Sequence, residues 1–144
     1  MGADLRLGWS DVDRLAGEVA QQLLRSAFRP TVILAIARGG MVPAATLAHL
    51  LGIKRVELVR ASSYGADRAQ SRVRLGRIPI LDHERVLVVD DLIDSGATMR
   101  HVRRYYPQSQ GAALLSKLAD APVEFCGRRI EPDIWVVFPW EVRA

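Results

Sequence analysis

The run TVILAIA at residues 31–37 restricts the possible folds more than any other feature, because it is uncharged and rich in branched side chains. Such a run is typical of a strand buried on both faces, as in a parallel sheet. Similar apolar runs are RVLVVDD at 85–91 and GAALLSK at 111–117. Helices are predicted over 9–25, 43–52 and 97–106, and further strands over 55–63 and 133–141. This alternation predicts an α/β fold, with a mostly parallel sheet flanked by helices and right-handed crossovers.

Several residues mark where the predicted helices begin and end. In the first helix Ser10 can act as the N-cap, and Asp13 stands where a capping box places an acid. Pro43 opens the second helix and Gly52 closes it. Residues 64–84 are polar, basic and rich in turn formers, which predicts a hairpin or a mobile loop.

Length and charge limit the organisation and the partners. The 144 residues predict a single domain over 1–144 with its own core. A net charge of +4 gives a mild preference for anionic partners. The basic residues are scattered, with local density only at 100–104 and 127–129, so we favour solvated basic surfaces and predict no nucleic-acid binding.

Cysteine content and hydropathy bear on location. The single cysteine, Cys126, excludes an internal disulfide and offers no zinc-binding spacing, so a reducing cytoplasm is expected. The longest apolar run, 31–37, is too short to span a bilayer, and no membrane span is predicted. Charged residues near the start of the chain, such as Asp4 and Arg6, do not fit a secretory signal.

The segment VLVVDDLIDSGAT at 86–98 carries three aspartates, Asp90, Asp91 and Asp94, directly after a predicted core strand. In open α/β sheets ligands bind outside the carboxyl ends of the strands, where this segment lies. The turn over 95–98 has hydroxyls, a glycine and a helix start, which suit a phosphate. Paired carboxylates suit vicinal hydroxyls or Mg²⁺, so the segment predicts a sugar phosphate bound with magnesium. Helix capping alone, or an aspartyl-phosphate receiver, explains three clustered acids less well.

The same segment resembles the phosphoribosyl-pyrophosphate signature of type I phosphoribosyltransferases, although Ser95 stands where threonine is more common. The resemblance implies that Asp90 and Asp91 bind the ribose hydroxyls, with Asp91 also contacting Mg²⁺. It implies that Asp94 is the general base that accepts the proton of purine N7. The residues implied to bind the 5′-phosphate are Asp94, Ser95, Gly96, Ala97 and Thr98.

Residues 33–64 and the segments SKLADAP (116–122) and DIWVVFPWE (133–141) are similar to bacterial xanthine-guanine phosphoribosyltransferases. The resemblance implies that Arg38 and Gly39, in the ARGG turn, bind pyrophosphate. Guanidinium geometry suits that anion. Ser63 and Tyr64 match the start of a flexible loop, 62–77, that closes over the site.

The resemblance also implies how a base is held, in a small C-terminal hood. Lys117 would donate to the 6-oxo group of a purine, Trp135 would stack on the base, and Val136 would flank it. For Trp9 and Trp140 we expect positions in the core. Residues 77–84 and 123–132 match the family poorly, so the exact purine is left open.

The implied function is purine salvage, in which phosphoribose passes from phosphoribosyl pyrophosphate to guanine, xanthine or hypoxanthine with Mg²⁺ as cofactor. A cytoplasmic homo-oligomer, dimer or tetramer, is expected. Three alternatives stay open. They are a transferase for adenine or a pyrimidine, a phosphoribosyl-pyrophosphate-binding regulator that binds RNA, and a non-catalytic sensor of that sugar phosphate.

Overall fold

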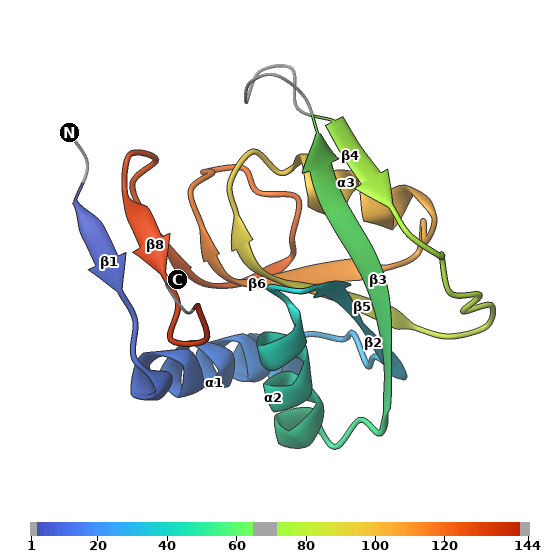
Figure 1. The fold of residues 1–144 in the computed structure, drawn as a ribbon. Helices are drawn as coiled ribbons and strands as arrows, with labels where there is room; N and C mark the ends of the chain where they lie inside the picture. Colours follow the sequence, from blue (N-terminus) through green and yellow to red (C-terminus); the bar gives the residue numbers. More distant parts are fainter. Residues whose placement is uncertain (1–2, 65–71, 142–144) are drawn as a thin grey trace.

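A six-stranded sheet forms the centre of the computed structural model, which describes residues 3–64 and 72–141 (Figure 1). The strand order is β4-β3-β2-β5-β6-β7, and every pairing is parallel except β3 with β4. The strands are β2 (Val32–Ala37), β3 (Arg55–Tyr64), β4 (Arg72–Leu75), β5 (Val86–Ile93), β6 (Gln110–Ser116) and β7 (Phe125–Arg129). All six residues of β2 are buried, which confirms the two-sided burial predicted from its composition.

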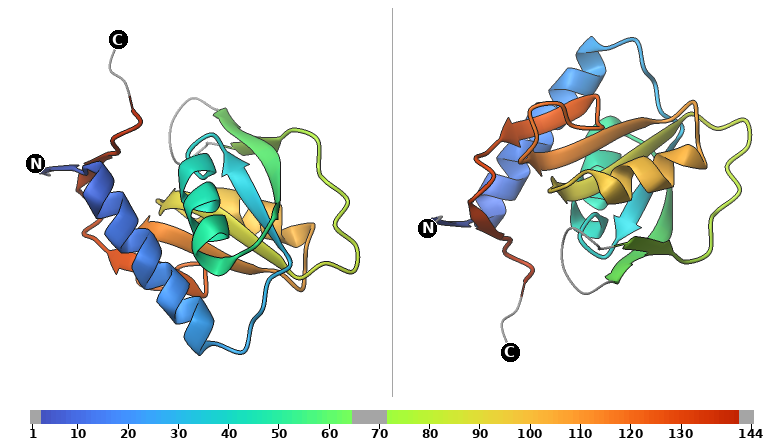
Figure 2. Two further views of the ribbon diagram at one scale, coloured as in Figure 1. Left: turned by 90° about the horizontal axis from the view of Figure 1, so that it is seen from below. Right: turned by 90° about the horizontal axis from the view of Figure 1, so that it is seen from above.

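Three helices cover the two faces of this sheet: α1 (Trp9–Arg25), α2 (Met41–Leu51) and α3 (Ala97–Arg104). Helices α1 and α2 lie on one face and α3 lies on the other, as Figure 2 shows from both sides. Each face has its own apolar core. The α/β prediction, with a mostly parallel sheet between helices, is therefore confirmed.

A second, two-stranded sheet lies beside the first and was predicted only in part. Strand β1 (Asp4–Arg6) pairs in parallel with β8 (Trp135–Val137) (Figure 1). The strand predicted over 133–141 corresponds to β8, whereas β1 and β7 were not predicted. Strand β1 has only three residues, and β7 has a Gly-Arg-Arg ending that carries no apolar pattern.

Main-chain groups of Cys126, in the edge strand β7, form hydrogen bonds with a side chain of α1. The amide of Gln22 donates from Nε2 to the carbonyl of Cys126 (2.7 Å) and accepts from its N–H at Oε1 (3.1 Å). Because the partner is a side chain and not another strand, this pairing leaves no periodic signal in the sequence.

The predicted ends of the helices need four corrections. Helix α2 begins at Met41 after the N-cap Gly40, so Pro43 is its third residue and does not open it. Gly8, not Ser10, is the N-cap of α1, and its N–H donates to the Asp11 carboxylate (2.8 Å), so the capping acid is not Asp13. Trp9 begins that helix and is 58% exposed, so its assignment to the core was wrong. Helix α3 ends at Arg104 rather than at 106, whereas Gly52 closes α2 in the left-handed conformation as predicted.

The chain changes direction across the sheet between β2 and β5. From β2 it proceeds to β3 on one side, and from β5 it proceeds to β6 and β7 on the other. The turns after β2 and β5 therefore flank a crevice at the carboxyl ends of adjacent strands, where α/β proteins bind ligands. No helix among residues 3–64 and 72–141 is long and apolar enough to cross a bilayer.

Candidate functional site

The two adjacent aspartates of β5 face different sides of the sheet. Strand β5 continues to Ile93, so both lie within it, and consecutive strand residues point to opposite faces. Val88 packs in the core under α3 and Val89 in the core under α1 and α2. Continuing this alternation, Asp90 lines a cavity on the α3 side and Asp91 lines another beside the turn after β2. The end of β5 thus presents one carboxylate to each of two cavities.

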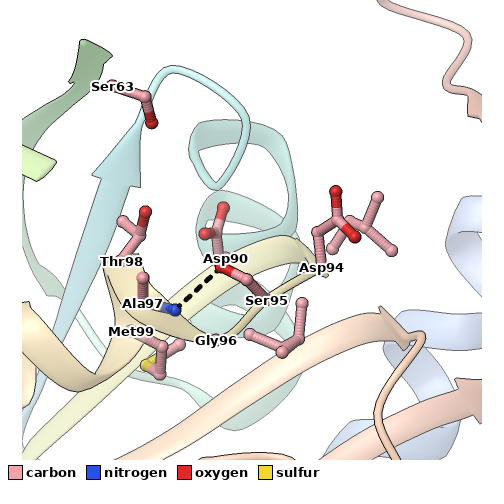
Figure 3. A pocket seen from close by; sticks show the side chains of 10 residues that line it. Ser63, Asp90, Asp94, Ser95, Gly96, Ala97, Thr98 and Met99 are labelled. Carbon is pink, nitrogen blue, oxygen red and sulfur yellow. Dashed lines mark hydrogen bonds between the residues drawn. The ribbon is translucent and has the colours of Figure 1, made fainter. Parts of the chain in front are cut away.

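The first cavity, of about 450 Å³, is built around the turn between β5 and α3. Figure 3 shows Ser63, from the end of β3, facing the same space as Asp90 and Thr98. Its lining residues are Ser63, Asp90, Leu92, Ile93, Asp94, Ser95, Gly96, Ala97, Thr98 and Met99. All five residues predicted to bind a 5′-phosphate therefore line one cavity.

Gly96 makes this turn possible, because it adopts a φ of +84°, which side chains rarely tolerate. Directly after it, the N–H of Ala97 donates to the hydroxyl of Ser95 at 3.3 Å. This contact is long, and it holds the hydroxyl at the helix start, where an anion is favoured. The turn is therefore suited to exchange that internal contact for a phosphate oxygen.

The second cavity, of about 640 Å³, is lined by Arg38, Gly39, Asp91, Trp140 and Glu141. Gly39 is required here, because a Cβ atom at this position would lie 2.7 Å from Cγ of Asp91. The peptide bond between Ala37 and Arg38 is cis. Arg38 and Gly39, predicted to bind pyrophosphate, therefore lie beside the second aspartate of β5.

Trp140 and Glu141 were not predicted as site residues. Trp140 stacks on Phe138, with ring centroids 4.6 Å apart, and packs against the core while reaching the second cavity. The resemblance marked the whole segment 133–141, but only Trp135 and Val136 were singled out from it. The available signal was an acid, Glu141, directly after Trp140 in a segment that the resemblance had marked.

Burial is the main reason that the pKa of Asp90 lies well above its usual range, and repulsion from Asp91 adds to it. Burial also raises the pKa of Asp91, although the N–H of Leu92 donates to its Oδ1 at 2.7 Å and opposes the shift. Both residues are half-buried, and each lines a cavity. Each is therefore a recessed acid that a cation or a hydroxyl donor would stabilise in its charged form.

We predict that Asp90→Asn stabilises the ligand-free protein. A raised pKa in the folded state means that the stability associated with Asp90 is present below its unfolded-state pKa and is lost as pH rises through the folded-state pKa. In the parent structure the N–H of Asp91 donates to Oδ1 of Asp90 at 2.9 Å, and the side-chain oxygen of asparagine can accept the same hydrogen bond. In buffer without divalent cations, the Tm of Asp90→Asn should exceed that of the parent. This difference should increase from pH 5 to pH 8, where it should reach roughly 3 °C. A variant with no gain at pH 8 contradicts the assignment, and exposed Asp13→Asn is the control.

Lys117 follows the last residue of β6 and is buried, with 7% of its side chain exposed. Its main-chain N–H donates to the carbonyl of Ile93 (2.9 Å), which fixes it beside the end of β5. Its Nζ lies 3.8 Å from Oδ1 of Asp94, forming an ion pair. The structure thus brings together the residues predicted to be the base-binding cation and the general base.

Four predicted site residues line neither of these two cavities: Lys117, Trp135, Val136 and Tyr64. Trp135 begins β8 and is 63% exposed, whereas its neighbour Val136 is buried. Tyr64 ends β3 and lies under the guanidinium of Arg74, 4.8 Å from the ring centroid. Residues 61–64 pair with residues 72–75 in antiparallel orientation, which agrees with the hairpin alternative predicted for 64–84 but begins earlier in the chain. Residues 65–71 of the predicted flexible loop lie outside the described residues.

The donors present suit magnesium that is shared with a ligand. Within residues 3–64 and 72–141 no three His, Cys, Asp or Glu side chains are grouped to hold a metal by themselves. Asp91 and Glu141 nevertheless supply two carboxylates to the second cavity, next to Arg38. Mg²⁺ is often held by one or two carboxylates together with water and ligand phosphates, and these residues fit that arrangement.

Comparison with known proteins agrees with this geometry. A family model described as the phosphoribosyl transferase domain matches residues 8–143. The xanthine-guanine phosphoribosyltransferase of Gluconobacter oxydans is 35% identical over 137 residues, covering 92% of this chain and 82% of that protein. A purine phosphoribosyltransferase from Pyrococcus horikoshii has a TM-score of 0.77 and 28% identity, covering 98% and 96%. A xanthine-guanine-hypoxanthine phosphoribosyltransferase from Helicobacter pylori has a similar fold (TM-score 0.80, 22% identity, covering 99% and 95%).

Proposed function

The chain belongs to the phosphoribosyl transferase domain family, and from that membership we propose that it transfers phosphoribose to a 6-oxopurine. The donor is phosphoribosyl pyrophosphate, and the products are the nucleoside monophosphate and pyrophosphate. One observation carries the proposal. The end of β5 separates a phosphate-type turn from an arginine-containing turn, and it directs one carboxylate toward each. A sugar with an anionic group at both ends matches this division.

The 5′ end of the donor occupies the first cavity in this proposal. The N–H groups that begin α3 and the hydroxyls of Ser95 and Thr98 bind the 5′-phosphate. Asp90 accepts hydrogen bonds from the ribose hydroxyls, and their approach favours its charged form. Ser63, at the end of β3, lines the same cavity, so its hydroxyl is available to the bound sugar phosphate.

The pyrophosphate end occupies the second cavity. Arg38 supplies a guanidinium and Gly39 an accessible main-chain N–H. Asp91 holds Mg²⁺ directly or through water, and the second carboxylate of this cavity is Glu141. When bound, the metal neutralises charge on the departing pyrophosphate. The Arg38 guanidinium also stabilises the departing pyrophosphate, because its positive charge faces the oxygens on which negative charge increases.

The base lies between Lys117 and the C-terminal hood. The Lys117 ammonium donates to the 6-oxo group, which selects against a 6-amino group that cannot accept that bond. Trp135 stacks on the base, for which its exposed ring is available, and main-chain groups near Val136 contact the far edge. Stacking is tolerant of the base, so the polar contacts provide the selection.

The transfer exchanges one bond at the anomeric carbon for another. The bond from that carbon to the pyrophosphate oxygen breaks, and a bond to a purine nitrogen forms through an oxocarbenium-like state. Asp94 accepts the proton from purine N7, and its ion pair with Lys117 keeps its carboxylate next to the base-binding cation. Exclusion of water from the site protects the oxocarbenium-like state from hydrolysis.

A panel of bases tests this proposal directly. Adenine, guanine, hypoxanthine, xanthine and uracil are each incubated with phosphoribosyl pyrophosphate and Mg²⁺, and the nucleotide formed is measured. We expect product from the three 6-oxopurines and little from adenine or uracil. Product mainly from adenine or uracil would favour the alternative transferases. No product with any base, together with a gel shift on RNA, would favour a regulatory protein.

Lys117→Ala should reduce selection for 6-oxopurines. Removing the donor is expected to lower kcat/KM for hypoxanthine by about 100-fold, with a much smaller change for adenine. The matched control is Lys54→Ala, which removes an exposed ammonium after α2. An unchanged ratio of kcat/KM values for hypoxanthine and adenine would refute the assignment of Lys117.

We also propose a cytoplasmic homo-oligomer, either a dimer or a tetramer. Exposed apolar side chains on α2 and β3 support self-association, because such surfaces are commonly buried between subunits. They are Met41, Leu50, Val56 and Leu58. Light scattering after size-exclusion chromatography gives the mass, and a monomer at micromolar concentration contradicts this part of the proposal.

A further inference from the structure

Arg100 holds the turn of the first cavity from outside that cavity. It lies on the first turn of α3, and its main-chain N–H donates to the carbonyl of Gly96 (3.0 Å). Its side chain folds back, so that the guanidinium Nη1 donates to the carbonyl of Ser95 at 3.1 Å. Arg100 lines a shallow groove with Pro122 on the outer side of α3, and it does not line the first cavity. Resting on the function proposed above, we infer that Arg100 is a positioning residue for the 5′-phosphate site.

The hydrogen bond from Arg100 to the carbonyl of Ser95 also fixes the direction of the next N–H, because the peptide bond between them is planar and trans. The carbonyl of Ser95 and the N–H of Gly96 belong to one planar unit and point in opposite directions. Because the carbonyl is directed to Arg100 in the outer groove, the N–H of Gly96 is directed away from that groove. An N–H that turns toward the first cavity can donate to a phosphate, whereas a carbonyl there would repel it. Arg100 thus selects the peptide orientation that an anion requires.

Gly96 has a second function in this arrangement. A Cβ atom on Gly96 would lie 2.9 Å from Nη1 of Arg100 and 3.1 Å from Cγ of Pro122. The absence of a side chain therefore lets the guanidinium lie against the turn. The glycine and the arginine together form one unit, and the positive φ of Gly96 is the backbone conformation that this unit uses.

The charge of Arg100 acts in the same direction as its hydrogen bond. Among the residues that the structure describes, no carboxylate lies within 4.0 Å of its guanidinium, whereas nearby Arg103 pairs with Glu124 at 2.9 Å. A cation behind the turn adds to the positive end of the α3 dipole. Both effects favour ligands that carry a 5′-phosphate, and neither acts directly on the reacting carbon.

The test compares substitutions of Arg100 by calorimetry and by steady-state kinetics. Arg100→Ala should weaken binding of phosphoribosyl pyrophosphate and of a nucleoside 5′-monophosphate by about tenfold, the loss of one charge-assisted hydrogen bond. Binding of inorganic pyrophosphate and kcat should change less than about twofold. Arg100→Lys should recover part of the affinity, because it keeps the charge and one donor. Arg104→Ala is the control, since Arg104 lines the same groove without a hydrogen bond to the turn.

The outcomes are distinguishable. A parent protein that binds neither phosphoribosyl pyrophosphate nor a nucleoside monophosphate overturns the proposed function and this role together. A parent that binds both, with Arg100→Ala binding equally well, overturns only the role of Arg100. Equal weakening for inorganic pyrophosphate, or a matching loss with Arg104→Ala, would instead indicate general electrostatics and would also reject the positioning role. Melting curves confirm that each variant is folded.

Discussion

Asp94→Asn is expected to lower kcat by at least about 100-fold, the usual contribution of a general base. Asparagine has nearly the same shape as aspartate but cannot accept a proton at neutral pH. The Kd for phosphoribosyl pyrophosphate should change by less than about threefold, because four of the five residues of the phosphate turn are untouched. Single-turnover assays at saturating purine separate the chemical step from binding of the base.

The ion pair between Asp94 and Lys117 is the reason why the chemical step has to be measured separately from binding of the base. Asp94 Oδ1 lies 3.8 Å from Nζ of Lys117, so the substitution also changes the field around the base-binding cation. An altered KM for the base is therefore compatible with the assignment, whereas kcat at saturation tests it. Asp13→Asn, an exposed substitution on α1, should leave both constants unchanged. Undiminished turnover by Asp94→Asn would falsify the general-base role.

Gly39→Ala should have a comparable effect for a steric reason. The new methyl group would lie 2.7 Å from Cγ and 2.8 Å from Oδ1 of Asp91, so the carboxylate or the turn has to move. Displacement of a positioned group by about 1 Å can cost about 100-fold in rate, and we expect kcat/KM to fall by that amount. Because Asp91 is the proposed magnesium contact, the Mg²⁺ concentration for half-maximal activity should also rise.

Gly17→Ala provides the matched control for this substitution. Gly17 lies within α1, and a Cβ atom there has no neighbour within 4 Å. The same added methyl group should therefore stabilise the protein by about 1 kcal/mol, as expected for alanine in a helix. Activity should be unchanged. Equal activity of Gly39→Ala and Gly17→Ala would show that the turn after β2 does not require its glycine.

The sequence predicted the central architecture because that architecture depends on local patterns. Strand β2 and the first four residues of β5 are continuous apolar runs, and the helices between strands have periodic apolar faces or clear end signals. Both kinds of pattern are visible without tertiary information. The acidic turn was predictable for the same reason, since all its residues are consecutive.

Features that depend on distant contacts were missed. Strand β1 exists because it pairs with β8, about 130 residues away along the chain by the register of Asp4 with Trp135. The ring of Trp9, the first residue of α1, lies 6.0 Å from that of Trp140, so the start of this helix contacts the C-terminal segment. Glu141 reaches the second cavity through the same C-terminal segment. Local propensity does not encode such long-range placement.

The amide of Gln22 on the margin of β7 has a consequence for assembly. It occupies hydrogen-bonding positions that a strand of another molecule would need, and β4 at the other margin is only four residues long and carries Arg72 and Arg74. Long unprotected margins allow sheets to join into fibres. Both features oppose extension of the six-stranded sheet by another copy of the chain, and so they favour contacts through side chains, which permit closed assemblies.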